Sequence, residues 1–371
     1  MVDPELVRLR LLAQGLARPA AADPHEAVGA LGAMQGQDLP GVISSIALRL
    51  SPLPEDDRVA RVLAGFNDGT IVRGYPMRGT VFAVGADDLA WMTELCADGP
   101  LRAQTKRRSF LGLDQAQIDL ARQVLENSAA ATPTGISRSD LFALWDAAGM
   151  SSAKGRGYHV LSHLVAHRVA CYGPWNGQDN NVVLAETWLP RESTLAEHFN
   201  DDRMAAIAAM LLRYLTGHGP ATLRDFCWWT KLSLTAVRKA FSLIEDQVET
   251  DPSLDDPAGE ARYFRPGLID DAAALGAELD TTYLLPGFDE LVLGYPDRLV
   301  LVPETHHELL VPGNNGMFQK CIVRKGTVTG TWKRAGRPGK RVLEINGFKP
   351  LPKVAQNEAE RAFDRFPHPS S

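Results

Sequence analysis

Gly219-Pro220-Ala221-Thr222-Leu223-Arg224-Asp225-Phe226 decides the fold, because the chain repeats its pattern at Gly135–Phe142. In both copies a Ser or Thr stands where a helix is expected to begin and an acid follows three residues later, as in a capping box. A second helix and a strand-like segment follow each copy, and Trp145 and Trp229 lie at nearly the same place in each. The spacing of about 85 residues predicts tandem units of one architecture.

The first 110 residues show a similar order of elements. Asp3-Pro4 and Asp23-Pro24 each place an N-cap residue before a proline at the first helical position. Helices followed by a β-ribbon are the order of a winged helix-turn-helix. Beyond these two helix starts, the pattern predicts helices at 42–50 and 58–66 and short strands at 70–73 and 79–84.

The composition changes after Asp280. Short apolar runs there alternate with Gly, Pro and Asn, and Lys325-Gly326 between two of them predicts a hairpin turn. The pattern is typical of a small antiparallel sheet or barrel. The tail, residues 366–371, is expected to be frayed.

The expected fold class is mainly α with β-ribbons, an α+β fold of tandem winged helix-turn-helix units and a small C-terminal β-barrel or sheet. A chain of 371 residues is long enough for two to four compact units. We place them as winged-helix unit 1 (1–110), unit 2 (111–195), unit 3 (196–275) and a basic β-rich element (276–371).

Composition favours a soluble, intracellular protein. Apolar residues make up 45% and charged residues 23% of the chain, which is ordinary for a globular protein. The four cysteines are scattered without a CxxC pair, which argues against a disulfide framework or a zinc site. No apolar run approaches a membrane span, and the charged first helix is unlike a signal peptide. We therefore expect a cytoplasmic protein. The further expectations are a monomer and, if its partner is DNA, association with the nucleoid.

Charge is unevenly distributed along the chain. The net charge is -6, which by itself disfavours a DNA partner. Residues 246–310 carry fifteen acids against three arginines, whereas residues 320–353 carry ten Lys and Arg against Glu344 alone. This asymmetry predicts one anion-binding face on an acidic body. A solvated basic surface without a ligand remains the alternative.

Gln35-Gly36-Gln37-Asp38 is the main candidate for chemistry, and it follows a helix expected to end at Met34. A glutamine amide offers one acceptor and two donors and does not titrate, so a pair of glutamines can orient a water molecule. If this segment lines a nucleic-acid cleft, the chain is a hydrolase that acts on a base or a sugar. Otherwise the segment is a polar helix cap.

His159, His163 and His167 repeat at helical spacing. The first and last are about 12 Å apart along a helix, so the three cannot share one ion, and no nearby carboxylate or thiol completes a set. A polar helix face is favoured over a metal site, and no metal is expected. The chain also lacks the GxGxxG, GxxxxGK[ST], HExxH and GxSxG motifs, so no cofactor is expected.

Several basic and aromatic residues are candidates for DNA contact. Lys106-Arg107-Arg108 is a basic run of the kind that contacts phosphates, although most such runs are merely solvated. Trp332 is flanked by two cations and either enters a groove or packs inward, and at least one of Trp228 and Trp229 is expected in the core. The predicted DNA-binding residues are Arg78, Lys106, Arg107, Arg108, Arg156, Lys320, Arg324, Lys325, Trp332, Lys333 and Arg334.

Five motifs occur in an order that resembles one group of proteins. They are Gln35–Pro40, Met77–Thr80, Gly219–Thr222 with Phe226 and Trp228-Trp229, Leu284–Pro286 with Phe288–Glu290, and Gly330–Arg334. The set resembles the winged-helix DNA glycosylases of the AlkZ/YcaQ-like family, bacterial enzymes that include azinomycin-resistance and crosslink-unhooking members. The resemblance covers nearly the whole chain.

The resemblance implies three tandem winged-helix units and a C-terminal β-rich element around a concave basic surface. It also implies a catalytic QxQ signature, which falls here on Gln35 and Gln37. Gly36 stands where relatives more often carry a larger apolar residue, and Phe82 stands where a histidine is expected.

The function expected is that of a monofunctional DNA glycosylase. It would remove N7- or N3-alkylated purines, or unhook crosslinks, from damaged double-stranded DNA. Gln35 and Gln37 would hold the water and turn their dipoles toward an oxocarbenium-like state, with Asp38 as general base. The alternatives are a non-catalytic winged-helix DNA-binding regulator and a protein-interaction scaffold that does not bind DNA.

Overall fold

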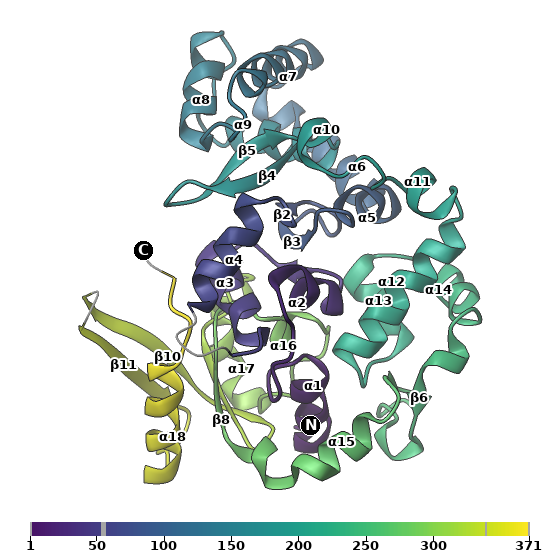
Figure 1. Cartoon of the computed structure of the whole chain (residues 1–371), viewed down its shortest axis with the longest axis vertical. Helices are drawn as coiled ribbons and strands as arrows, with labels where there is room; N and C mark the ends of the chain where they lie inside the picture. Colours follow the sequence, from purple (N-terminus) through teal and green to yellow (C-terminus); the bar gives the residue numbers. More distant parts are fainter. Residues whose placement is uncertain (1, 53–56, 338–339, 370–371) are drawn as a thin grey trace.

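The computed structural model describes residues 2–52, 57–337 and 340–369. Its named strands form three antiparallel sheets, and helices surround them (Figure 1). This is the α+β fold that the sequence predicts. In the part of the chain that the structure describes, no helix has the length and the apolar character needed to cross a bilayer.

The N-terminal segment begins with the two helices that the aspartate–proline pairs predict. The side chains of Asp3 and Asp23 accept hydrogen bonds from the third backbone amide beyond each of them. The elements of this segment are α1 (Pro4–Ala13), α2 (Pro24–Leu31), β1 (Met34–Gln35), α3 (Leu39–Arg49), α4 (Arg58–Asn67), β2 (Ile71–Gly74), β3 (Phe82–Gly85), α5 (Leu89–Cys96) and α6 (Asp98–Arg107).

Helix α2 ends earlier than the sequence predicts. Gly32 follows its last residue with a φ of 79°, a conformation that glycine adopts without strain. Met34 and Gln35 then form β1, which pairs with Ala83 and Phe82 of β3. The expectation of a helix that runs to Met34 is therefore wrong, and the QxQ motif begins in a strand.

The next two groups each combine helices with a two-stranded ribbon. The first contains α7 (Gln115–Ala130), α8 (Arg138–Ala147), α9 (Arg156–Ala166), β4 (Ala170–Trp175), β5 (Asn180–Leu184) and α10 (Ala185–Trp188). The second contains α11 (Leu195–Phe199), α12 (Arg203–His218), α13 (Leu223–Thr230), α14 (Leu234–Phe241), β6 (Glu249–Thr250), β7 (Tyr263–Phe264) and α15 (Leu268–Leu275).

The two copies of the repeated pattern begin helices as predicted. Thr222 and Asp225 form both hydrogen bonds of a capping box at α13, whereas Ser137 caps α8 by accepting only the Asp140 amide. Trp145 and Trp229 are both fully buried. Their matching positions therefore reflect matching roles in two cores.

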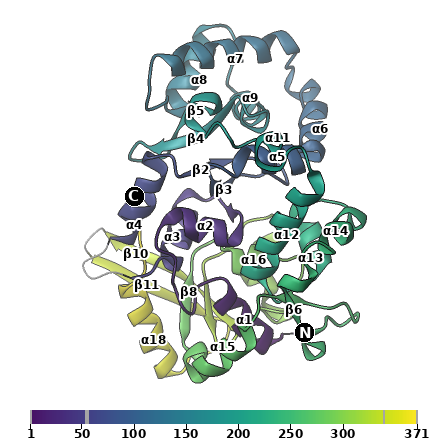
Figure 2. The same ribbon diagram turned by 45° about the vertical axis from the view of Figure 1, so that its right-hand side comes forward.

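The strands of the N-terminal segment and the β4–β5 ribbon join into one sheet. Its strand order is β1-β3-β2-β4-β5, and Arg73 of β2 is paired with Tyr172 of β4. Figure 2 shows β2 and β3 beside β4 and β5, with α7, α8 and α9 at the end of the molecule beyond them. The shared sheet links the QxQ strand to the group that contains α7–α10.

The C-terminal segment contains the expected antiparallel sheet, of order β11-β10-β9-β8. Lys325 and Gly326 form the predicted hairpin turn, both with positive φ. The apolar run 299–302 is a buried turn and not a strand. The elements are β8 (Thr282–Leu285), α16 (Glu290–Leu293), α17 (Glu304–Leu310), β9 (Cys321–Arg324), β10 (Thr327–Arg337), β11 (Lys340–Gly347) and α18 (Lys353–Asp364).

The end of the chain is packed and not frayed as far as it is described. Phe366 is 7% exposed, the carbonyl of Pro367 accepts a hydrogen bond from Ser44, and His368 lies beside Trp332. Burial of an aromatic ring is enough to order a short segment that follows a helix. The expectation of fraying also covered Ser370 and Ser371, which lie outside the described residues.

Candidate active site

The first half of the QxQ motif is held by backbone hydrogen bonds. The Gln35 amide donates to Oε1 of Glu290 at 2.6 Å, and the Gly36 amide donates to the carbonyl of Val81 at 2.8 Å. The guanidinium of Arg73 donates to the Gly36 carbonyl at 3.0 Å. These bonds place residues 35 and 36 rigidly between β3 and the C-terminal segment.

Glu290, the partner of the Gln35 backbone amide, belongs to a set of buried charged side chains. Glu290 is fully buried and also contacts His218, with 3.4 Å between Oε2 and Nε2. Burial lowers the pKa of His218, partly opposed by Glu290, so the imidazole is a neutral partner. Beside Glu290, the carboxylate of Asp289 accepts from Arg49 at 2.9 Å and from Ser45 at 2.5 Å. Burial alone would raise the pKa of Asp289, but the charge of Arg49 and the hydrogen bonds from Arg49, Ser45 and the Leu291 amide together outweigh it, so the pKa is lowered.

Arg73 extends the support to the group that contains α7–α10. Its Nε donates to Asn180 at 2.7 Å, its second terminal nitrogen donates to Asp179 at 2.7 Å, and only 6% of its surface is exposed. One side chain thus joins the QxQ backbone, β2 and the β4–β5 ribbon.

Gln37 and Asp38 open onto a cavity of about 640 Å³. Basic side chains of the C-terminal sheet line the same cavity, and aromatic side chains form another part of its wall. The lining residues are Gln37, Asp38, Gly287, Phe288, Met317, Phe318, Gln319, Lys320, Trp332, Lys333 and Arg334. The cavity therefore joins the end of the QxQ motif to the basic region predicted from charge.

Asp38 is the N-cap residue of α3 and a partly buried carboxylate. Burial raises its pKa, while the Gly41 backbone and the charge of Lys320 oppose the shift. A Cβ atom at Gly41 would lie 2.6 Å from Oδ2 of Asp38, so only glycine leaves room for this carboxylate. A carboxylate with a raised pKa beside a cation suits general-base chemistry.

The two glutamines occupy different positions. Gln37 is exposed at the cavity, whereas Gln35 is 5% exposed and its side-chain carbonyl accepts from Arg78 at 3.1 Å. The structure brings Gln37 and Asp38 together at the cavity, whereas Gln35 is buried and does not belong to the cavity lining.

The predicted DNA-binding residues of the C-terminal sheet divide into three sets. Lys320, Lys333 and Arg334 line the cavity. Lys325 is exposed at the hairpin turn away from this lining, and Arg324 is bound to Glu358, with 3.1 Å between Nε and Oε2. The structure thus brings three of these basic residues to the QxQ motif.

Trp332 belongs to the core and cannot enter a DNA groove as folded. It is 2% exposed, its indole nitrogen donates to the carbonyl of Leu285 at 2.9 Å, and its ring packs on Phe363 and Phe366. The expectation of a groove-contacting Trp332 is therefore corrected in favour of the inward-packed alternative. Moving a packed indole with a hydrogen-bonded N–H out of the core would expose its apolar ring and break that hydrogen bond, which is unfavourable.

The remaining predicted DNA contacts lie around α6 and α9. Lys106 and Arg107 are exposed at the end of α6. Arg108 donates to a ring nitrogen of His163 at 2.9 Å, and Arg156 donates to the carbonyl of Leu111 at 2.8 Å. Arg108 and Arg156 thus already have protein partners, whereas Lys106 and Arg107 face solvent.

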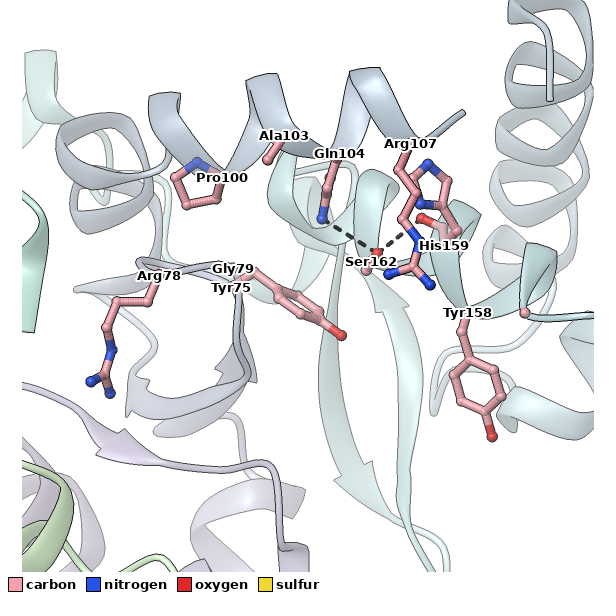
Figure 3. A pocket seen from close by; sticks show the side chains of 11 residues that line it. Tyr75, Arg78, Gly79, Pro100, Ala103, Gln104, Arg107, Tyr158, His159 and Ser162 are labelled. Carbon is pink, nitrogen blue, oxygen red and sulfur yellow. Dashed lines mark hydrogen bonds between the residues drawn. The ribbon is translucent and has the colours of Figure 1, made fainter. Parts of the chain in front are cut away.

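A second hollow, of about 470 Å³, lies between α6, α9 and the loop that joins β2 to β3 (Figure 3). Gln104, Arg107, His159 and Ser162 gather at one end, and Gln104 donates to Ser162 at 3.4 Å. Arg78 points away from this group, consistent with its bond to Gln35. The described lining includes Arg78 and Arg107 and no carboxylate, so the hollow is basic.

Sequence reasoning assigned no role to Glu290 or Asp289, and it expected Arg73 only in a ribbon that could probe the DNA groove. Phe288-Asp289-Glu290 stood out as a motif, but nothing in it identified the partners of the two acids. The contacts join residues 240 or more positions apart for both carboxylates, and no local pattern encodes them.

Most of the chain is similar to known proteins. Residues 28–368 match the family described as DNA glycosylase AlkZ-like. The chain is 26% identical over 330 residues to the interstrand DNA cross-link repair glycosylase of Streptomyces sahachiroi, covering 85% of this chain and 82% of that protein. The solved structure of Streptomyces sahachiroi DNA glycosylase AlkZ superposes with a TM-score of 0.66 at 21% identity, covering 98% of this chain and 95% of that one.

The similarity in structure shows a shared fold, and the match over residues 28–368 extends through the QxQ motif, the shared sheet and the basic C-terminal sheet. The chain therefore belongs to the AlkZ-like DNA glycosylase family.

Proposed function

We propose that this chain is a monofunctional DNA glycosylase that releases N7- or N3-alkylated purines, or unhooks crosslinked ones, from damaged double-stranded DNA. The observation that carries the proposal is one cavity lined by Gln37, Asp38, Lys320, Lys333 and Arg334. It offers a water site and negative charge beside cations that attract a phosphate backbone. The name of the Streptomyces sahachiroi relative supports a lesion of this kind.

The chemistry needs little from the protein. An N-alkylated purine is cationic and leaves readily, and the sugar passes through an oxocarbenium-like state. Gln37 orients the attacking water through its amide, and Asp38 accepts the water proton and stabilises the positive sugar. Base and sugar separate as the C1′–N bond breaks, water oxygen bonds to C1′, and an abasic site results.

Gln35 has a different role from Gln37 in this mechanism. The side-chain carbonyl of Gln35 accepts a hydrogen bond from Arg78, and its backbone N–H donates one to Glu290. These two bonds hold the segment that carries Gln37 and Asp38. Gln35 is therefore a positioning residue, and Gln37 touches the water.

The test is base release from a duplex that carries a single N7-methylguanine. We expect Gln37→Ala to lose release and to keep binding of the duplex, because the water site and not the DNA surface is removed. Gln319→Ala is the matched control, since it removes another glutamine amide from the same cavity. Unchanged turnover in both Gln35→Ala and Gln37→Ala would overturn the proposal.

Two further outcomes bear on the class of protein. Salt-dependent binding of undamaged duplex without release of any alkylated base would favour the non-catalytic regulator. A borohydride-trapped covalent adduct with Lys320, the cavity lysine whose charge acts on Asp38, would contradict a monofunctional mechanism. We also propose that the protein acts as a monomer at the nucleoid, which size-exclusion chromatography with light scattering tests for the oligomeric state.

A further inference from the structure

Three cations surround the half-buried ring of Trp228, which lies on α13. The distances to the ring centroid are 5.0 Å for Arg78, 5.2 Å for Lys231 and 5.6 Å for Arg298. The cations come from the β2–β3 loop, the C-cap of α13 and the turn that follows α16. We call these four residues the Trp228 cluster.

The positive charges of the cluster are not neutralised by ion pairs within the described residues. Glu290 attracts Arg78 and Asp297 attracts Arg298, but neither carboxylate lies within ion-pair distance. The Nε atoms of Arg78 and Arg298 are buried without a hydrogen-bond partner. Burial lowers the pKa of Lys231 and of Arg298, and the charge of Arg78 lowers both further. Cation–π contact offsets part of this repulsion, and a bound anion would offset the rest.

The cluster lies next to the candidate active site. Arg298 is 5.0 Å from the ring of Phe318, which lines the cavity of Gln37 and Asp38. Arg78 is bonded to Gln35 and also lines the hollow between α6 and α9. The hollow and the cluster thus share Arg78, and the contact of Arg298 with Phe318 places the cluster beside the cavity.

We propose that Arg78, Lys231 and Arg298 bind one backbone phosphate of the DNA strand whose damaged nucleotide enters the cavity. Guanidinium groups donate two hydrogen bonds in one plane to a phosphate, and Lys231 adds a point charge. Trp228 contacts all three cations while the DNA is absent. This inference rests on the proposed function in one respect, the assignment of the phosphate to the damaged strand.

The test measures the affinity for undamaged duplex as salt is varied. Lys231→Gln and Arg298→Gln leave Arg78 and the Gln35 bond intact, and Lys239→Gln is the matched control because it removes an exposed lysine of α14. We expect the double variant to bind about tenfold more weakly at 0.1 M salt. The slope of log affinity against log salt should become less steep by about 0.9, the value for one lost phosphate contact.

A slope and affinity equal to those of Lys239→Gln would overturn the inference. If the double variant does not fold, Lys231→Gln alone decides, because this side chain is exposed and lies outside the core. Failure of the proposed function can be told apart from failure of the phosphate site. If the parent protein releases no base but the double variant still shows the changed salt slope, the glycosylase proposal fails and the phosphate site stands. A double variant that releases base and binds duplex as the control does would keep the glycosylase proposal and refute the phosphate site.

Discussion

The backbone amide of Gln35 donates a 2.6 Å hydrogen bond to the carboxylate of Glu290, across 255 positions of the chain. Gln35 is 5% exposed and Glu290 is fully buried. The bond connects β1, which belongs to the shared sheet, with α16 of the C-terminal segment. It sets where Gln37 and Asp38 emerge relative to the basic strands.

Glu290→Ala is therefore expected to weaken both stability and base release. The change leaves the Gln35 amide and His218 buried without their partner, which lowers the free energy of unfolding by about 2–3 kcal/mol. Urea unfolding and single-turnover release measure the two effects. Glu290→Gln keeps an acceptor at the same place and should lose less in both, and equal losses for the two variants would contradict this role.

Asp38→Asn should separate stability from activity. The folded protein holds the pKa of Asp38 above its ordinary value, mainly by burial, so the ionised carboxylate destabilises the fold at neutral pH. This destabilisation is present above the raised pKa and disappears as pH falls toward the ordinary aspartate range. We expect the variant to be more stable than the parent at pH 7, with a difference that vanishes in acid, and to release base at least about 100-fold more slowly.

The same shift predicts the pH dependence of activity. Because a general base must be ionised, the rate of base release should fall as pH drops through the raised pKa of Asp38, above the usual range of an aspartate. A pH–rate profile under single-turnover conditions measures it. A profile that stays flat down to the ordinary aspartate range would contradict Asp38 as the base.

His163 should make the protein sensitive to acid. Burial, helped by the charges of His167 and Arg108, lowers its pKa to about 3. Between pH 6.5 and 3 the unfolded chain binds a proton that the folded chain excludes, so stability is lost as pH falls, by at most about 1.4 kcal/mol per pH unit. Unfolding at pH 7 and pH 5 should show a smaller difference for His163→Gln than for the parent.

Gly36→Ala should disturb the QxQ strand. An added Cβ would lie 3.0 Å from the amide nitrogen of Ala83 and 3.1 Å from the carbonyl carbon of Phe82, so β1 must shift away from β3. We expect a loss of about 1–3 kcal/mol in unfolding free energy and a slower release of base. Gly29→Ala is the control, because its Cβ meets nothing within 4 Å and alanine favours the helix interior.

Trp332→Ala should behave as a core mutation. Its ring is packed among Phe363 and Phe366, so truncation is expected to lower the unfolding free energy by about 3–5 kcal/mol. Lys333→Gln, at the exposed neighbouring position, should instead weaken DNA binding at unchanged stability. A stable Trp332→Ala that has lost only DNA binding would restore the groove-contacting interpretation.

Local patterns predicted most elements of this chain. The aspartate–proline pairs, the Thr222 capping box and the Lys325-Gly326 turn act within a few residues, so they can be identified without knowing the tertiary contacts. The charge excess of residues 320–353 was likewise visible, and three of its residues line the cavity.

Tertiary structure decided the rest, because the deciding contacts join residues far apart in the chain. The separation of buried Gln35 from exposed Gln37 depends on Glu290, Arg78 and Arg73, and the direction of Trp332 depends on a core that α18 completes. By itself the sequence determined the helices, the ribbons and the segments that carry charge. Which of those side chains meet at one cavity was settled only by packing, since burial and long-range hydrogen bonds have no local signature.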